Sequence, residues 1–186
     1  VRGFALMLAD GGTVNPGKAA EAFFFLGGGY LFGIPTPIYV FAAVGVLATI
    51  TLKLTPFGRA IYAVGSNEEA AHLSGINVPL VTFGVYIIGG ILAALSGLIF
   101  LSRLSVGDPN SGLGLELEAI TIAVIGGPSL FGGEGSVIGT IGGAMILAII
   151  ANVLNLAGVS PFSQQVVKGA IIILAVLLEA GRKPRK

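Results

Sequence analysis

A long uncharged run, Leu80 to Leu101, constrains this chain more than any other feature of its sequence. At about 1.5 Å per residue, a helix over this run reaches about 33 Å, enough to cross a hydrocarbon core of about 30 Å. Charged residues make up only 10% of the whole sequence, whereas a soluble domain carries about 25%. So few charges exclude a solvated globular surface, and the high apolar content excludes disorder. The sequence therefore predicts an all-α membrane protein.

Other apolar segments predict a polytopic helical bundle with about five crossings. Pro37 to Leu52, residues 136–157 and residues 165–180 each have the composition of a spanning helix. The segment Leu117 to Leu130 is equally apolar but too short to span as a regular helix. We expect it to form a short or broken helix within residues 117–135.

The basic residues predict which ends of the spans face the cytoplasm. They concentrate in the C-terminal GRKPRK, and Lys53 and Arg59 lie in the loop 53–79. The positive-inside rule places both regions in the cytoplasm. An odd number of crossings must then follow this loop, so the short segment must cross as well, with its break at residues 126–135.

The first 36 residues have the least regular pattern. We expect the end of a helix in residues 1–9 and an irregular segment on the outer face in residues 10–36. An apolar start runs directly into a loop and lacks the basic first region of a signal peptide. We therefore expect residues 1–186 to be the C-terminal half of a longer membrane protein.

Glycine is unusually frequent, with 30 residues, roughly 16% against the usual share of about 7%. Small residues let helices approach closely in lipid, and helix breaks occur where backbone lines an enclosed cavity. Gly126, Gly127 and Ser129, within the 126–135 break, are therefore candidates for a translocation path, in which free backbone groups meet a polar solute. The alternative is a tight turn that only allows close helix packing.

Two asparagines, Asn152 and Asn155, lie three residues apart on one face of the helix expected over residues 136–157. Amide side chains are costly against lipid and usually face other helices or a polar cavity. They are candidates for the translocation path, and an interhelical hydrogen bond is the alternative.

The loop 53–79 contains a helix with recognisable ends. Ser66 and Glu69 fit a capping box, with Ser66 as N-cap and Glu69 at N3. Gly75 suits a left-handed C-terminal residue, and Pro79 follows it. The pattern predicts a helix of about two turns, which serves either as a connector resting on the bundle or as a docking element for a cytoplasmic partner.

Motifs for catalysis and nucleotide binding are absent from the sequence. It contains no HExxH, GxSxG or GxxxxGK[ST] motif, no cysteine, and a single histidine, His72. We therefore expect no enzyme activity and no cofactor or metal, with any ATP bound by a separate subunit. The net charge of +1, without a basic cluster outside the tail, also argues against nucleic acid as a partner.

Three ordered segments carry a resemblance to a known family. They are FGRAIYAVGSNEEAAHLSGINV, ELEAITIAVIGGPSLFGGEGSVIGTIGGAMIL and NLAGVSPFSQQVVKGAIIILAVLL. The first contains Glu69-Ala70-Ala71-x-x-x-Gly75, which resembles the EAA loop of ABC importer permeases. Together the segments resemble the permease subunits of ribose/xylose/galactose-type monosaccharide importers, over about residues 1 to 180.

The resemblance implies a sugar permease of the bacterial cytoplasmic (inner) membrane. A homodimer of such permeases lies in the lipid bilayer on ABC ATPase subunits and receives sugar from an extracytoplasmic binding protein. The short cytoplasmic helix would transmit closure of the ATPase. The residues to which this coupling role carries over are Gly65, Asn67, Glu68, Glu69, Ala70, Ala71, Ser74 and Gly75.

Other functions remain open from the sequence. Permeases for branched-chain amino acids, nucleosides or autoinducers share much of this pattern. A secondary transporter or channel without an ATPase is a second class, although such proteins usually need ionisable groups within the membrane. An inactive truncated fragment is a third.

Overall fold

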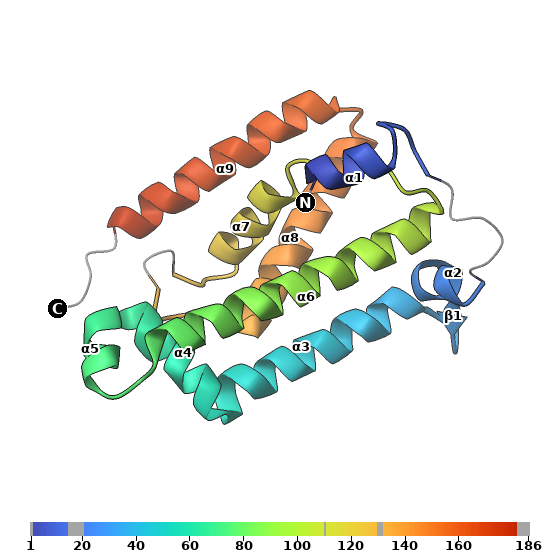
Figure 1. Ribbon diagram of the computed structural model, residues 1–186. Coiled ribbons are helices and arrows are strands. Elements are labelled where there is room, and N and C mark those ends of the chain that lie inside the picture. Colours follow the sequence, from blue (N-terminus) through green and yellow to red (C-terminus); the bar gives the residue numbers. More distant parts are fainter. Residues whose placement is uncertain (1, 15–20, 110, 130–131, 182–186) are drawn as a thin grey trace. The chain divides into compact units, whose positions relative to one another are not determined.

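The structure is a computed structural model that describes residues 2–14, 21–109, 111–129 and 132–181 (Figure 1). Its internal contacts divide the chain into two compact units. The first unit comprises Val1–Val46 and Thr82–Leu113, and the second comprises Leu47–Val81 and Gly114–Lys186. Every candidate site residue named above belongs to the second unit.

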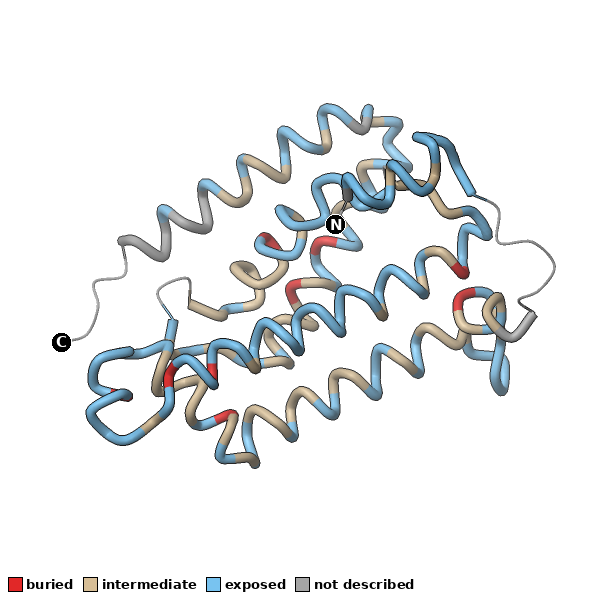
Figure 2. The backbone as a smooth tube through the Cα atoms, viewed as in Figure 1, coloured by how far each residue is buried: buried red, intermediate tan, exposed pale blue. Residues whose placement is uncertain are grey.

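Three of the described helices are long and apolar enough to cross a membrane: α3 (Thr36–Leu54), α6 (Val78–Leu104) and α8 (Val137–Leu156). They coincide with three of the predicted spans. Many of their large apolar side chains are exposed, and few residues along these helices are buried (Figure 2), as expected for helices whose surroundings are lipid rather than water. The prediction of a helical membrane protein is confirmed.

The short or broken helix is also confirmed. Helix α7 (Leu115–Ile125) has 11 residues, so it reaches only about 16 Å, and the chain becomes helical again at Val137. Helix α9 (Pro161–Gly181) begins earlier than predicted, and its described apolar part is Phe162–Ile173. Five crossings therefore remain a prediction, and the basic residues 182–186 that oriented the chain lie outside the described residues.

In the first unit, helix α1 (Arg2–Leu8) matches the expected helix end. The prediction of an irregular segment over residues 10–36 is wrong from residue 21 onward, because the chain forms helix α2 (Glu21–Gly28) and a hairpin of β1 (Tyr30–Leu31) and β2 (Ile34–Pro35). Residues 15–20 of that segment lie outside the described residues. The two central residues of the hairpin turn, Phe32 and Gly33, have positive φ values of +50° and +80°. This is the type I′ geometry that matches the twist of paired strands.

A buried serine joins α2 to the end of α6 within this unit. The hydroxyl of Ser102, 2% exposed, accepts a 2.7 Å hydrogen bond from the amide of Gly27 and donates one of 2.5 Å to the carbonyl of Phe23. A Cβ on Gly27 would lie 2.5 Å from the amide nitrogen of Arg103. The two helices therefore meet backbone to backbone.

In the second unit, the chain after α3 forms helix α4 (Pro56–Ser66) in a region predicted to be loop. The side chain of Thr55 caps it by accepting a hydrogen bond from the amide of Gly58, 3.1 Å away. Pro56 occupies a first-turn position, where its missing N–H costs nothing. Threonine followed by proline is a start signal that could have predicted this helix.

The helix predicted within residues 53–79 is present as α5 (Glu68–Leu73), but its predicted N-cap is wrong. Asn67, not Ser66, is the N-cap, and its Oδ1 accepts a 2.9 Å hydrogen bond from the amide of Ala70. Ser66 instead belongs to the last turn of α4. Because α4 extends to Ser66, only Asn67 remains to end one helix and begin the next, and it serves as cap to both.

Helices α7 and α8 pack closely through glycine. A Cβ on Gly126 would lie 2.6 Å from Cα of Thr140, and a Cβ on Gly139 would collide with the carbonyl oxygen of Gly126. Thr121 of α7 and Leu147 of α8 are buried, with exposed fractions of 0% and 3%. The glycine excess thus serves close helix packing here, as small residues do in membranes.

Candidate functional site

The predicted coupling residues gather at α4, α5 and the turn that follows. Asn67 caps α5, and Glu68 and Glu69 occupy its first turn, where negative charge suits the helix dipole. Ser74 ends the helix, and its hydroxyl donates a 2.8 Å hydrogen bond to the carbonyl of Ala70. Both ends of this short helix are therefore held by side chains adjacent in sequence.

The exit from α5 is a Schellman motif. The amide of Gly75 donates to the carbonyl of His72 at 3.0 Å, and the amide of Ile76 donates to the carbonyl of Ala71 at 3.1 Å. Gly75 has φ of +84°, which a residue with a Cβ adopts only at a cost. The prediction of a left-handed glycine at this position is confirmed.

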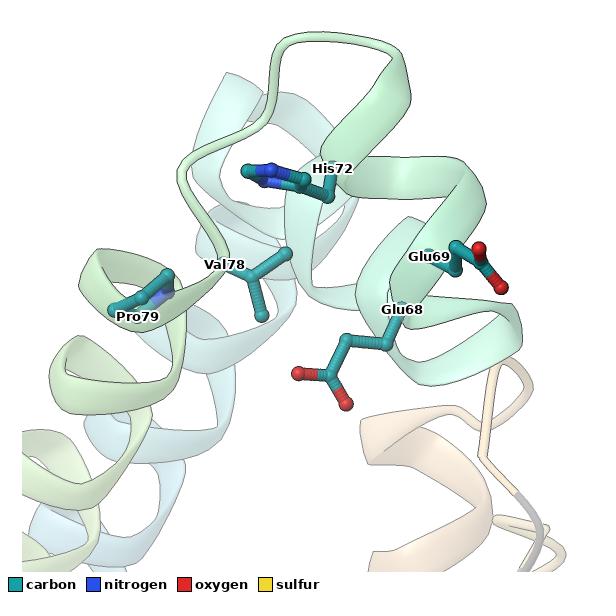
Figure 3. Close-up of a pocket in the computed structure, with 5 residues that line it drawn as sticks. All are labelled: Glu68, Glu69, His72, Val78 and Pro79. Atoms are coloured by element: carbon teal, nitrogen blue, oxygen red, sulfur yellow. The ribbon is translucent and has the colours of Figure 1, made fainter.

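A cavity of about 480 Å³ lies beside α5, lined by Glu68, Glu69, His72, Val78 and Pro79 (Figure 3). The ring of His72 and the side chain of Val78 face each other, and the carboxylate of Glu68 lies on the same side (Figure 3). Glu69 borders the cavity, with its carboxylate pointing outward. The lining is therefore mainly apolar, with the carboxylate of Glu68 beside it.

The two alanines of the EAA pattern have different surroundings. Ala70 is exposed, so it can allow close approach of another molecule. Ala71 is only 4% exposed, which places it against its own chain. The small side chain of Ala71 therefore lets α5 pack closely against the rest of its own chain. The sequence pattern did not reveal this role.

Gly65, also named as a coupling residue, lies in the last turn of α4 against the 126–135 break. A Cβ on Gly65 would lie 2.8 Å from the amide nitrogen of Gly133, and a Cβ on Gly132 would collide with the carbonyl oxygen of Gly65. The structure thus brings together Gly65 and the 126–135 break, which no sequence pattern connects.

The candidate path residues do not form one site. Gly126 packs on the first turns of α8, whereas Asn152 and Asn155 lie in its last turns. From Gly139 to Asn152 the helix rises about 20 Å. Gly127 and Ser129 follow α7 in the break, where the amide of Ser129 donates to the carbonyl of Glu134 at 3.1 Å.

Asn155 takes part in an interhelical hydrogen bond. Its Oδ1 accepts from Nε2 of Gln164 in α9 at 2.9 Å, and the same nitrogen donates to the carbonyl of Val159 at 3.0 Å. This observation favours the structural interpretation for Asn155. Asn152 is exposed.

An ion pair that was not predicted from the sequence joins two helices of this unit. Nζ of Lys168 in α9 lies 2.8 Å from Oε1 of Glu118 in α7. The residues are 50 positions apart, so no local pattern could reveal the pair. Within the described residues, no cluster of three or more metal-ligating side chains is found.

Comparison with known proteins places the chain in a transport family. Residues 4–176 match the family described as branched-chain amino acid transport system / permease component. The chain is 44% identical to the ribose import permease protein RbsC of Haemophilus influenzae over 96% of its own length and 56% of that protein. It is also 44% identical to RbsC of Bacillus subtilis, over 96% of its own length and 55% of that protein.

A third relative is the L-arabinose transport system permease protein AraH of Escherichia coli, 38% identical over 100% of this chain and 56% of that protein. The chain thus spans about half the length of the curated relatives that it matches. The search of solved structures found no match. The family consists of transport permeases rather than enzymes. On a match that covers almost all of its length, this chain belongs to the family of branched-chain amino acid transport system permease components.

Proposed function

We propose that the chain is the C-terminal half of the transmembrane subunit of an ATP-driven importer for a monosaccharide such as ribose. The observation that carries this proposal is α5, a short helix with defined caps that exposes Glu68 and Glu69. Identities of 38–44% to ribose and arabinose permeases support a sugar as the solute.

In this proposal α5 docks on a cytoplasmic ATPase subunit. The exposed carboxylates and the apolar lining at Val78 and Pro79 suit a groove that offers basic and apolar groups. Charge-assisted hydrogen bonds to carboxylates are stronger than neutral ones. The C-terminus would then lie in the cytoplasm of the bacterial inner membrane, an extracytoplasmic binding protein would deliver the sugar, and a second permease copy would complete the assembly.

The test replaces Gly75 in the permease reconstituted with its ATPase and binding protein in liposomes. Gly75→Pro cannot adopt the φ of +84°, because proline is restricted to about −65°, and Gly75→Val is strained there. Gly75→Asn is the matched control, since asparagine tolerates this conformation. We expect D-ribose uptake per ATP hydrolysed to fall in the first two variants and to survive in the third, with membrane insertion unchanged in all. Unchanged uptake in Gly75→Pro would overturn the assignment.

A second candidate solute is a branched-chain amino acid, which the family description favours. The same liposomes distinguish the two. Uptake of L-leucine without uptake of D-ribose, L-arabinose or D-xylose would replace the sugar proposal by the amino-acid one. If the purified permease neither binds an ATPase nor responds to ATP, a carrier or channel that works without a motor remains.

A further inference from the structure

The backbone of Gly65, in the last turn of α4, lies directly against the backbone of Gly132 and Gly133. A Cβ on Gly65 would lie 2.8 Å from the amide nitrogen of Gly133, and a Cβ on Gly133 would lie 2.9 Å from Cα of Ser66. A side chain between two segments can absorb a displacement by changing rotamer. Two backbones in direct contact have no such freedom. A displacement of either segment is therefore passed directly to the other.

A hydrogen bond supplements this contact one turn earlier. The hydroxyl of Tyr62 donates to the carbonyl of Gly135 at 2.8 Å. Gly65 and Ser66 lie three and four residues after Tyr62, so both are neighbours of Tyr62 on the surface of α4. We call these three residues the α4 face.

The α4 face is continuous with α5 on one side. Asn67 is the single residue between the two helices, and its own amide donates to the carbonyl of Ala63 at 3.1 Å, while its carbonyl accepts from the amide of Ala71 at 3.0 Å. A residue that belongs to both hydrogen-bond patterns leaves little freedom for α5 to move without α4.

On its other side, the break is continuous with α7 and α8. Ser136 caps α8 by accepting a 3.0 Å hydrogen bond from the amide of Gly139. A Cβ on Gly143 would lie 2.5 Å from the carbonyl oxygen of Ile122, so the two helices also meet backbone to backbone. A shift of the break is thus passed to both helices.

We propose that the α4 face is the link that transmits movement of α5 to α7 and α8, with Tyr62 and Gly65 as positioning residues. The proposal rests on the function proposed above, in which α5 binds the ATPase. It assigns to Gly65 a role inside the permease rather than on the docking surface. It also explains why glycine occupies positions 132 and 133, because any side chain at Gly132 or Gly133 would separate the two backbones.

The experiment measures D-ribose imported per ATP hydrolysed by the complete permease, reconstituted with its ATPase and binding protein in liposomes. Tyr62→Phe removes only the hydroxyl donor, and Gly65→Ala adds only the Cβ that the contact excludes. Tyr86→Phe is the control for the first, since Tyr86 is 77% exposed. Gly142→Ala is the control for the second, because Gly142 is also helical and has open space at its Cβ.

We expect the uptake ratio to fall about fivefold or more in Gly65→Ala, the lower end of typical coupling between two sites, and less in Tyr62→Phe. Co-purification with the ATPase and basal ATP hydrolysis should stay unchanged in both, as should the ratio in both controls. A merely structural role would lower the amount of folded permease without changing the ratio. If Gly65→Ala fails to insert, the isosteric Tyr62→Phe variant decides the question.

An unchanged ratio in Tyr62→Phe and Gly65→Ala, or an equal fall in their controls, would overturn the inference. If Gly75→Pro uncouples transport while these two variants do not, the inference fails and the proposed function stands. If the unaltered permease neither carries any of the three sugars nor binds an ATPase, the proposed function fails and the inference fails with it.

Discussion

The ammonium of Lys168 lies 2.8 Å from Oε1 of Glu118 and joins α9 to α7. Both side chains are about one-third exposed, at 30% and 31%, and most of the residues around them in sequence are apolar. An unpaired charge at the centre of a membrane helix costs about 2.5–3.5 kcal/mol on insertion scales. The pair therefore lets two otherwise costly residues stay in apolar helices.

We expect Lys168→Met alone to destabilise the permease by about 1–3 kcal/mol, because Glu118 would then be left without its partner. The double variant Lys168→Met with Glu118→Gln should recover most of this loss, since no charge remains. The measurement is a double-mutant cycle of the free energy of unfolding in detergent or lipid. Additive effects of the two single substitutions would contradict the pairing.

The N-cap of α5 makes a separate prediction. Asn67→Ala removes the oxygen that accepts from the amide of Ala70, at a cost of about 1 kcal/mol. Asn67→Asp keeps that acceptor and is the matched control. We expect hydrogen exchange at Ala70 to become faster in Asn67→Ala, together with weaker binding of the ATPase, and neither change in Asn67→Asp. Equal exchange in both variants would show that the cap does not hold the helix.

The packing of α7 on α8 is tested by two glycines of α8. Gly139→Leu would place a side chain against the carbonyl of Gly126, whereas Gly142→Leu enters open space. Overpacking of this kind typically costs about 1–3 kcal/mol. We expect a lower thermal unfolding midpoint for Gly139→Leu alone. Equal midpoints would mean that these helices do not pack as described.

The two asparagines of α8 should differ when each is replaced by leucine. Asn155→Leu loses the hydrogen bond from Gln164 and should destabilise the protein by about 0.6 kcal/mol, the average for such bonds in membranes. Asn152→Leu should leave stability unchanged, and a fall in D-ribose uptake would then assign Asn152 to the path. If both variants keep full uptake and full stability, the structural and the path interpretations are both excluded.

Local signals predicted the long spans and α5, but not α2, the β1–β2 hairpin or α4. A span depends on the length and composition of a continuous run, so α3, α6 and α8 were visible in the sequence. The end of α5 at Gly75 was visible for a similar reason, because a Schellman motif involves only neighbouring residues. The position of the cap, by contrast, was off by one residue. Ser66 and Asn67 are both good caps, and the extent of α4 decided between them.

The sequence by itself determined that this chain is a helical membrane protein with a short capped helix between two spans, because hydrophobic length and capping are properties of adjacent residues. Only the tertiary structure decided that Gly65 meets Gly133, that Lys168 pairs with Glu118 and that Asn155 binds Gln164. Those partners lie on different helices or across the break. Their meeting depends on how helices pack, which no local pattern of residues encodes.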